Sequence, residues 1–368
     1  MTTVAITGSS GFLGWHLRAH CHARPEMKII EIDRHAFGDA SRFQEIIRQA
    51  DVVVHLAGLN RGEDQEIERV NVNLTRQLIA TCQQTNAHPQ VVLANSTHRD
   101  RETAYGRSKQ QSADLLAAWA SEAGAIFTDL VLPNVYGEGG RPFYNSVVAT
   151  FCQQLASGEV PKIIQDGQLE LVHAQTVVHA IVTAVEGRLS GEVRVQGEPL
   201  SVSECLQKLR EFDRSYRGHL IPELKTDMDL DLFNTYRSYL YPRHYPVILQ
   251  LHSDARGDLF EAVKSLHGGQ CFISTTKPGI TRGNHYHTRK FERFLVLNGE
   301  AVIRIRKLLT GDIVGFKVSG SAPQYIDMPT FCTHDITNTG QGDLTTLFWA
   351  HEIFDPQQSD TIREPVES

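Results

Sequence analysis

Short apolar runs alternate with amphipathic segments over the first two thirds of the chain. Residues 4–6, 51–58, 91–95 and 126–131 are such runs, and the run at 51–58 is rich in β-branched residues, as in strands buried on both faces of a parallel sheet. Helical periodicity fills the intervals, for example over residues 64–85. The pattern predicts an α/β domain with a buried parallel sheet.

The periodicity changes near residue 246. A helical pattern over residues 201–245 ends in a segment, residues 241–246, that contains two prolines. Residues 247–354 then alternate short strands of period two with glycine turns, which is typical of an all-β barrel or sandwich. We therefore expect two domains, residues 1–246 and residues 247–368, as the chain length also suggests.

Composition and charge narrow the class of protein. A net charge of −7 without a basic run argues against a nucleic-acid partner. The N-terminus enters a strand without the features of a signal peptide, and no apolar run approaches the length of a membrane span. Six cysteines are scattered singly, which indicates reduced thiols. We expect a cytoplasmic protein with no membrane partner.

Three glycines follow the first apolar run at the spacing Gly8-x-x-Gly11-x-x-Gly14. A strand that turns at glycine into a helix leaves unpaired backbone N–H groups at the positive end of the helix dipole, and this combination binds phosphate. Gly8 permits the tight turn, Gly11 lets a pyrophosphate approach the main chain, and Gly14 lets the helix pack on the strand. The motif predicts a dinucleotide-binding Rossmann domain, with an ordinary βα turn as the competing interpretation.

A further apolar run, residues 28–33, ends in Asp33-Arg34. This is roughly 20 residues past the glycines, where a Rossmann fold reads the cofactor ribose. The carboxylate of Asp33 favours the free 2′-hydroxyl of NAD, whereas the guanidinium of Arg34 suits the 2′-phosphate of NADP. A solvated charge pair after a strand is a third interpretation. We expect NADPH, with NADH as the alternative.

Further motifs follow two of the later strands. Ser96 comes directly after residues 91–95, and Tyr105-x-x-x-Lys109 begins a helical pattern nine residues later. With the glycine turn and residues 55–58, these motifs resemble, in order and separation, the extended short-chain dehydrogenase/reductase family. The resemblance implies three sets of residues: catalytic Ser96, Tyr105 and Lys109; cofactor-binding Gly8, Ser10, Gly11, Phe12, Leu13, Gly14, Asp33, Arg34, Leu56, Ala57, Gly58, Tyr105 and Lys109; and substrate-binding Asn134, Arg141 and Asn145. Exposed loop polarity accounts for the last set nearly as well.

The chemistry of ketone reduction needs these residue types. Hydride transfer from a nicotinamide develops negative charge on the carbonyl oxygen, which needs a hydrogen-bond donor that then releases a proton. The resemblance implies that Tyr105 is this acid and that Ser96 gives a second hydrogen bond. We expect the ammonium of Lys109, one helical turn from Tyr105, to lower the pKa of the phenol and to hold the cofactor ribose.

One segment departs from the pattern of this family. Extended members carry a Val-Asp-Asp-type sequence before a late helix, and here the residues are Val172-His173-Ala174-Gln175-Thr176. The hydroxyl of Thr176 is able to cap that helix. Because of this difference, the family pattern does not predict how substrate is positioned near this segment.

Histidines dominate the motifs of the C-terminal domain. His285, His287 and Glu292 match the first cupin motif, and His334 lies in a segment that matches the second motif except that Phe331 replaces the usual glycine. Residues two apart project from one face of a strand, so we expect three imidazoles and one carboxylate to converge inside the barrel. These donors suit a divalent transition metal such as zinc.

The segment from Arg282 to His285 also resembles the active site of deoxysugar epimerase cupins, in which a histidine is the base and no metal is needed. His285 cannot be both a metal ligand and a free base. We favour the ligand role, because the other three residues complete a ligand set. The titratable neighbours, which the sequence does not rank for proton transfer, are Tyr286, Lys290, Asp335 and His351.

A reductase of this kind fused to a cupin resembles, over nearly the whole chain, the CapF-like bifunctional enzymes of bacterial capsule and O-antigen synthesis. The resemblance implies a UDP-linked 2-acetamido-2,6-dideoxy-4-keto-hexose as substrate. The cupin epimerises carbon 3, and the reductase domain then reduces the carbon 4 ketone with NADPH. The product is a UDP-N-acetyl-6-deoxy-L-talosamine-type precursor of N-acetyl-L-fucosamine. We also expect a homodimer.

Two functions of other classes stay open at this point. The chain is then either an NAD(P)-binding sensor whose cupin binds a sugar without turnover, or a reductase-like domain fused to a cupin isomerase or dioxygenase that acts on another small molecule. In the sensor, Ser96, Tyr105 and Lys109 would be dispensable.

Overall fold

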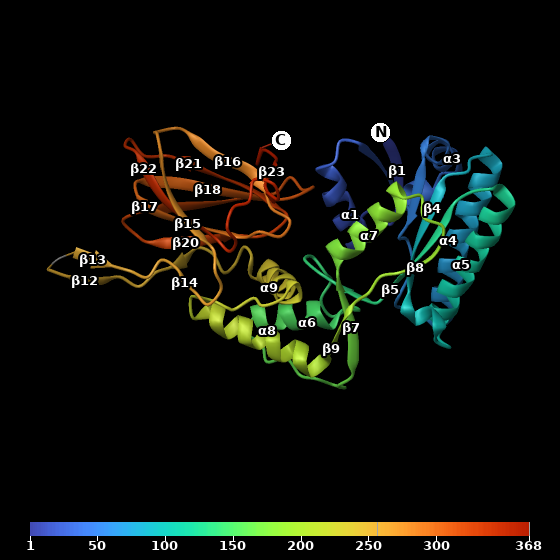
Figure 1. The fold of residues 1–368 in the computed structure, drawn as a ribbon, viewed down its shortest axis with the longest axis horizontal. Coiled ribbons are helices and arrows are strands. Elements are labelled where there is room, and N and C mark those ends of the chain that lie inside the picture. The colour runs from blue at the N-terminus through green and yellow to red at the C-terminus, as the bar shows by residue number, and fades with distance from the viewer. Residues whose placement is uncertain (256, 368) are drawn as a thin grey trace. The chain divides into compact units, whose positions relative to one another are not determined.

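The computed structural model describes residues 1–255 and 257–367, and they form two compact units. The first unit consists of residues 1–150 and 163–203, and the second consists of residues 151–162 and the chain from residue 204 onward. Figure 1 shows both units with their elements labelled. Among the described residues, no helix has both the length and the apolar character that crossing a membrane requires.

The first unit is built on a parallel sheet of six strands, which confirms the predicted Rossmann fold. In spatial order the strands are β2 (Met27–Ile32), β1 (Thr2–Thr7), β3 (Val52–His55), β4 (Gln90–Ser96), β5 (Phe127–Leu132) and β8 (Gly191–Arg194). Every neighbouring pair is parallel. The order reverses at β1 and β3, so the carboxyl ends of these two strands form the switch point at which such sheets bind ligands.

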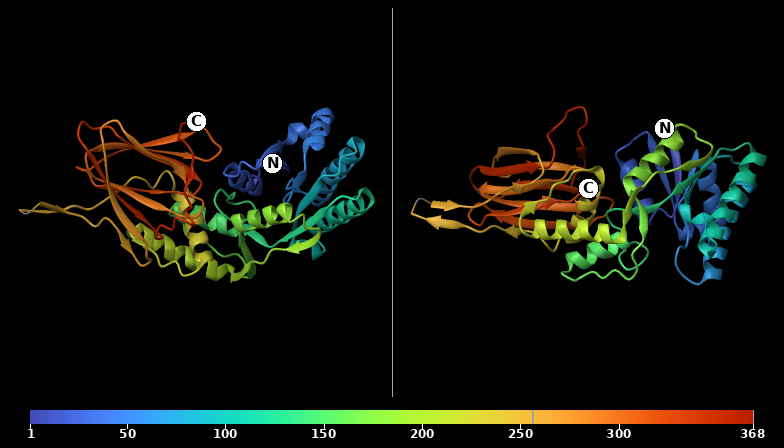
Figure 2. Two further views of the ribbon diagram at one scale, coloured as in Figure 1. Left: turned by 45° about the horizontal axis from the view of Figure 1, so that its top comes forward. Right: turned by 60° about the horizontal axis from the view of Figure 1, so that its bottom comes forward.

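Helices cover both faces of this sheet (Figures 1 and 2). They are α1 (Phe12–His22), α2 (Arg34–Gly38), α3 (Ala40–Gln49), α4 (Asp64–Thr85), α5 (Ala104–Ala123) and α7 (Ala174–Glu186), with a short 3₁₀ turn, η1 (Thr97–Asp100). Alternate residues of β1 belong to different cores: Val4 and Ile6 pack with α1 and α7, whereas Ala5 packs with α3, α4 and α5. Burial on both faces explains why the strands are continuous apolar runs.

A small second sheet completes the first unit. It contains β6 (Asn134–Tyr136), β7 (Gln168–His173) and β9 (Glu198–Ser201), in that order. Two helices cross from one unit to the other along the chain, namely α6 (Val147–Ala156) and α8 (Val202–Arg217).

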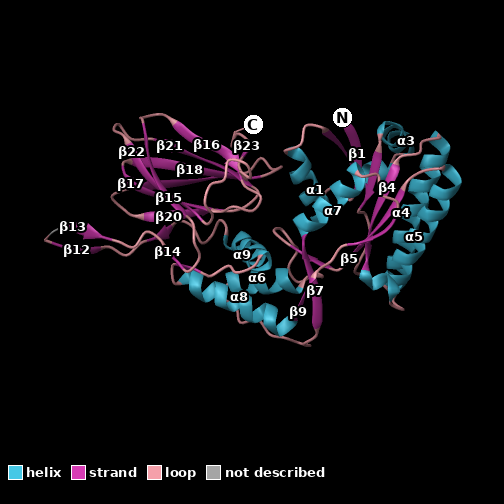
Figure 3. Ribbon diagram, in the orientation of Figure 1, coloured by secondary structure: helices cyan, strands magenta, loops and turns pink. Residues whose placement is uncertain are grey.

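The second unit contains two antiparallel sheets of five strands, which confirms the predicted all-β, cupin-like domain (Figure 3). The first sheet is β11 (Val247–Ile248), β20 (Gln324–Met328), β17 (Glu292–Asn298), β22 (Leu344–Ala350) and β15 (Gln270–Thr276); the second is β19 (Ile313–Ser319), β18 (Glu300–Lys307), β21 (Cys332–Asn338), β16 (Thr281–Tyr286) and β23 (Ile362–Arg363). Apolar side chains of both sheets form one core, for example Phe294 and Ile326 with Ile303 and Ile336. Two short ladders join β10 (Leu220–Ile221) to β14 (Lys264–Ser265) and β12 (His252–Asp254) to β13 (Gly257–Leu259).

Helices α8 and α9 (Asp227–Leu240) pack against these strands through a buried polar cluster. The guanidinium of Arg293 makes a bidentate ion pair with Asp327, at 2.7 and 3.0 Å. Tyr216 of α8 donates to the same carboxylate, and Arg237 of α9 donates to the carbonyl of Met328 at 3.2 Å. Helix α9 ends at Leu240 and the next strand begins at Val247, but the helices before residue 246 belong to the same compact unit as the strands after it.

Candidate functional site

The glycine turn between β1 and α1 leaves no room for side chains. Gly8 has φ +67°, and a Cβ atom there would lie 2.9 Å from the amide nitrogen of Ala57. A Cβ atom on Gly14 would lie 2.3 Å from the carbonyl oxygen of Gly8. Both positions therefore require glycine, and the turn brings the N-terminus of α1 against the end of β3.

A cleft of about 490 Å³ opens at this switch point within the first unit. It brings together thirteen of the residues predicted from the sequence: Gly8, Gly11, Phe12, Leu13, Gly14, Leu56, Gly58, Ser96, Tyr105, Lys109, Asn134, Arg141 and Asn145. Four predicted cofactor residues lie outside its lining: Ser10, Asp33, Arg34 and Ala57. Ser10 is exposed, and the amide of Ala57 donates to the hydroxyl of Thr7 at 3.1 Å.

The three predicted catalytic residues come from two adjacent elements. Ser96 ends β4, and Tyr105 and Lys109 lie one turn apart at the start of α5, which is capped by the hydroxyl of Thr103. The Tyr105 phenol is hydrogen-bonded to the Ser96 side chain, and Lys109 donates to the carbonyl of Ala94 at 2.6 Å. All three residues line the cleft, so a phenol, a hydroxyl and an ammonium are available in it.

Burial is the main influence on the pKa values of Tyr105 and Lys109. It raises the pKa of the Tyr105 phenol to about 12, although the hydrogen bond from Ser96 acts in the opposite direction. It lowers the pKa of Lys109 to about 8, which the carboxylate of Asp129 partly opposes. The expected lowering of the Tyr105 pKa is not seen in this structure, because burial of the phenol raises it, and the ammonium of Lys109 donates to the carbonyl of Ala94.

Two asparagines that the sequence analysis did not single out for a role hold this site in place. The Asn95 side chain accepts from the amide of Ser96 at 2.8 Å and donates to Asp129 at 2.8 Å, which fixes the end of β4. Asn71 of α4 bonds both the N–H and the C=O of Leu59, at 2.6 and 2.9 Å, and donates to the hydroxyl of Ser108. The sequence feature that could have identified them is a polar residue at a position where the apolar pattern predicts burial, because buried polar groups are normally hydrogen-bonded.

The segment that departs from the reductase pattern forms a buried polar contact. The imidazole of His173 lies 3.1 Å from the carboxylate of Glu138, just after β6. Burial raises the pKa of that carboxyl, but His173, with a smaller effect of His16, outweighs burial and lowers the pKa to about 2. Gln175 contacts His16 of α1 at 2.9 Å. Helix α7 begins at Ala174 with His173 as its N-cap residue, so the predicted capping by Thr176 is wrong. The contacts join the helix of the glycine turn to the loop that carries Arg141.

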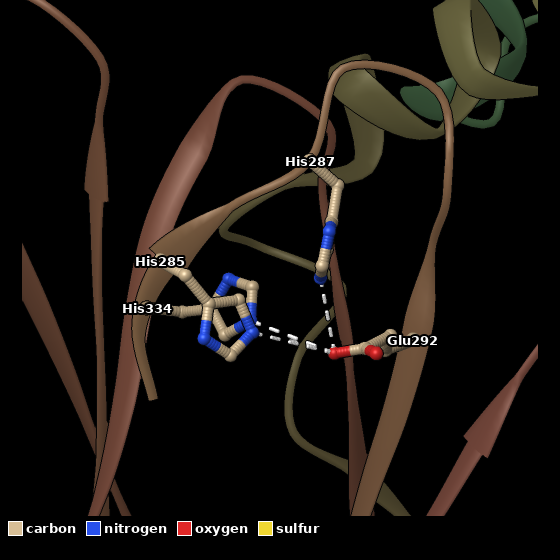
Figure 4. A group of neighbouring side chains, drawn as sticks. All are labelled: His285, His287, Glu292 and His334. Atoms are coloured by element: carbon tan, nitrogen blue, oxygen red, sulfur yellow. Dashed lines mark ion pairs between the residues drawn. The ribbon is translucent and has the colours of Figure 1, made fainter. Parts of the chain in front are cut away.

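A second candidate site lies inside the second unit (Figure 4). His285 of β16 pairs with His334 of β21, His287 follows β16, and Glu292 begins β17. The Nε2 atoms of His285, His287 and His334 lie 3.9, 3.1 and 3.7 Å from one carboxylate oxygen of Glu292. One ligand atom from each of the four residues lies within 4.8 Å of the others. The spacing of the cupin motifs therefore predicted a real cluster.

The donor set of this cluster fits a divalent cation. His334 Nδ1 donates to the carbonyl of Cys332 at 3.1 Å and His287 Nδ1 donates to the carbonyl of Asp360, which leaves both Nε2 atoms directed at Glu292. Those Nε2 atoms are buried and make no hydrogen bond among the described residues. Burial lowers the pKa of His334 to about 4, so the ring is neutral and able to coordinate.

Phe331 shows why glycine is usual at its position. Its φ is +57°, in the left-handed region that glycine adopts without strain. Its amide donates to the carbonyl of His287 at 2.7 Å, and its side chain is buried.

The titratable residues near the cluster differ in whether they contact one of its members. Asp335 pairs with Arg304 at 2.6 and 3.0 Å, and the ring of His351 stacks on Phe291. Lys290 lies 3.2 Å from the second carboxylate oxygen of Glu292. Of the four predicted candidates, Lys290 alone has a described ion pair with a member of the cluster.

Known proteins match this chain over nearly its whole length. The NAD dependent epimerase/dehydratase family matches residues 4–195, and the polysaccharide biosynthesis C-terminal domain matches residues 252–362. The UDP-2-acetamido-2,6-beta-L-arabino-hexul-4-ose reductase of Pseudomonas aeruginosa is 33% identical over 364 residues, which is 97% of each chain. The crystal structure of the capsular polysaccharide assembling protein CapF from Staphylococcus aureus is 33% identical with a TM-score of 0.65, and the match covers 99% of this chain and 100% of that one.

A more distant structure shares the fold of the first part alone. The UDP-N-acetylglucosamine 4-epimerase from Bacillus cereus is 18% identical with a TM-score of 0.51, and the match covers 58% of this chain and 82% of that one. By its two domains and by its full-length relatives, the chain belongs to the family of CapF-like UDP-4-keto-sugar reductases, in which an epimerase/dehydratase domain precedes a polysaccharide biosynthesis C-terminal domain.

Proposed function

We propose that this protein is a bifunctional enzyme of capsule or O-antigen synthesis that acts on a UDP-linked 2-acetamido-2,6-dideoxy-4-keto-hexose. The second unit epimerises carbon 3, and the first unit reduces the carbon 4 ketone with NADPH, giving the talosamine-type precursor of N-acetyl-L-fucosamine. The observation that carries the proposal is the convergence of Ser96, Tyr105 and Lys109 with the glycine turn in one cleft. We further propose that it acts as a homodimer, which its mass in solution would test.

Each of the three residues has a separate task in the reduction. Bound NADPH supplies the hydride. Tyr105, protonated because its pKa is about 12, donates a proton to the carbonyl oxygen, and the Ser96 hydroxyl gives that oxygen a second hydrogen bond. The ammonium of Lys109 holds the cofactor ribose and offsets the negative charge that develops beside it. Asn134, Arg141 and Asn145 line the same cleft and are proposed to bind the nucleotide sugar.

The protonation of Lys109 predicts how reduction depends on pH. Because burial lowers the pKa of this lysine to about 8, its ammonium is lost as the pH rises through that value. We expect kcat/KM for the sugar, measured at saturating NADPH, to fall about tenfold per pH unit above this midpoint. Circular dichroism over the same range controls for unfolding. A profile that stays flat well above the midpoint would contradict the role of the ammonium.

The two residues that follow β2, Asp33 and Arg34, favour NADPH over NADH as the cofactor. Asp33 caps α2, with its carboxylate accepting from the amide of Ala36 at 2.8 Å, whereas the side chain of Arg34 is exposed. We therefore expect wild-type kcat/KM to be higher with NADPH than with NADH. The substitution Arg34→Ala should lower that ratio about tenfold or more, the value of one charge-assisted hydrogen bond. Arg48→Ala, an exposed arginine of α3, serves as the control. Equal kcat/KM for the two cofactors in the wild type would contradict this assignment.

The proposed epimerisation depends on the acidity that a ketone confers. The carbon 3 proton is acidic only while carbon 4 is a ketone, so epimerisation must come first and reduction then fixes the configuration. A divalent cation, with zinc favoured by the donor set, supplies positive charge when bound. His285, His287, Glu292 and His334 are proposed to hold it.

The test of the whole proposal is the product. The purified protein is supplied with the 4-keto sugar and NADPH, and the product is identified by NMR while NADPH consumption is followed. Oxidised cofactor with inverted carbon 3 and a reduced carbon 4 supports the proposal. Binding without turnover would instead indicate a sensor, and oxygen consumption after addition of ferrous iron would indicate a dioxygenase. The outcomes are distinct because a reductase oxidises NADPH, a dioxygenase consumes oxygen, and a sensor consumes neither.

A further inference from the structure

The C-terminal segment pairs with the strand that carries one proposed metal ligand, His285, and that ends just before a second, His287. Strand β23 pairs antiparallel with β16, with Arg363 opposite His285 and Ile362 opposite Tyr286. The side chain of Val366 is fully buried. Strand β23 therefore lies directly beside His285, one of the proposed metal ligands.

One carboxylate of this segment organises the turn between two ligands. The side chain of Asp360 accepts hydrogen bonds from the amide and the hydroxyl of Thr288, at 3.0 and 2.7 Å. It also accepts from the amides of Arg289 and Lys290, at 2.7 Å each. These donors are consecutive residues of the turn that joins His287 to Glu292, so the carboxylate fixes the spacing of both ligands.

The main chain of Asp360 also orients a ligand. Its carbonyl accepts from Nδ1 of His287, which sets the tautomer and directs Nε2 of that ring to the cluster. The next residue, Thr361, lies 3.3 Å from the ammonium of Lys290, which contacts Glu292 at 3.2 Å. Asp360 thus contacts the ligand His287 directly, and Thr361 contacts Lys290, the ion-pair partner of the ligand Glu292.

The rest of the segment is anchored independently of Asp360. Arg306 donates to the carbonyls of Val366 and Pro365, at 2.7 and 2.8 Å, and pairs with Glu364 at 3.1 Å. The amide of Glu364 donates to the carbonyl of Asn284 at 3.0 Å. Removing the carboxylate of Asp360 should therefore release the turn while the segment stays in place.

We propose that Asp360 is a positioning residue of the metal centre, which holds the turn from His287 to Glu292 and the tautomer of His287. The inference rests on the metal centre of the proposed function. Outer-shell partners of metal ligands commonly change affinity by about 10- to 100-fold, and Asp360 serves one ligand directly and the turn to a second.

The test compares Asp360→Ala with Glu367→Ala, a control that removes an exposed carboxylate paired with Arg304 in the same segment. Zinc affinity is measured on each full-length protein by competition with a chelator. We expect Asp360→Ala to bind Zn²⁺ about 10- to 100-fold more weakly and Glu367→Ala to bind like the wild type. Asp360→Asn, which keeps one acceptor oxygen, should fall between them.

Two further readouts separate positioning from a general loss of structure. The visible spectrum of the Co²⁺-loaded protein should change in Asp360→Ala, because it reports ligand geometry. The rise in Tm on adding Zn²⁺ should shrink, while the Tm of the metal-free protein changes little. If Asp360→Ala binds Zn²⁺ with wild-type affinity and its Co²⁺ spectrum is unchanged, the inference about Asp360 is wrong but the metal centre stands. A wild-type protein that binds no Zn²⁺ would overturn the metal centre as well, and an equal loss in Glu367→Ala would show that charge rather than position matters.

Discussion

Replacing Tyr105 with phenylalanine is expected to lower kcat for ketone reduction by about 100- to 10,000-fold. The substitution removes the hydroxyl that donates the proton and leaves the ring, the helix α5 and the glycine turn in place. Single-turnover reduction of the 4-keto sugar, followed by NADPH oxidation, measures the effect. The dissociation constant for NADPH should stay close to that of the wild type, because the phenol contributes to the chemical step rather than to cofactor binding.

A matched variant separates loss of the acid from loss of a tyrosine hydroxyl in general. Tyr241→Phe removes a hydroxyl in the second unit, where it donates to the carbonyl of Ile305 at 3.4 Å. We expect this variant to reduce the sugar at nearly the wild-type rate. If Tyr105→Phe does the same, another group is the proton donor and the assignment of Tyr105 is wrong.

His334→Ala is expected to abolish exchange of the carbon 3 proton. The substitution removes a fully buried imidazole whose Nε2 faces Glu292, so the cluster keeps three of its four donors and should lose most of its metal affinity. The measurement is deuterium incorporation at carbon 3 in heavy water without NADPH. Reduction of the unepimerised ketone should persist, because Ser96, Tyr105 and Lys109 are unchanged.

His252→Ala is the corresponding control, since this histidine is exposed on β12 and is not a member of the cluster. It should retain both metal and proton exchange. A separate measurement on the metal-free wild type tests the role of the metal. If that protein exchanges the carbon 3 proton as fast as the metal-loaded protein, the metal is structural. His285 is then the leading candidate for the base.

Features with a local pattern were predictable from the sequence. The parallel sheet follows from continuous apolar runs, the glycine turn from a fixed spacing that sterics enforce at Gly8 and Gly14, and the four-residue cluster from the spacing of the cupin motifs. Each depends on residues near one another in the chain or on a motif of fixed length.

Features that depend on distant residues were not predictable in the same way. The pKa of Tyr105 follows from burial and from the hydrogen bond to Ser96, which only the packed structure defines. The role of Asn71 depends on contacts with Leu59 and Ser108, and that of Asp360 on a turn some seventy residues earlier. Polar residues of this kind look like ordinary helix or loop positions in a single sequence.

The interleaving of the two units along the chain affects how the protein is made. Residues 151–162 belong to the second unit, where Arg217 of α8 donates to the carbonyls of Leu155 and Ala156 at 2.9 and 3.2 Å. On the ribosome, the end of α6 therefore emerges well before the helix that satisfies it, whereas the first unit has all its residues once residue 203 is synthesised. No single cut in the gene yields both units whole, so a chimaera that exchanges one unit between relatives must transfer two segments together.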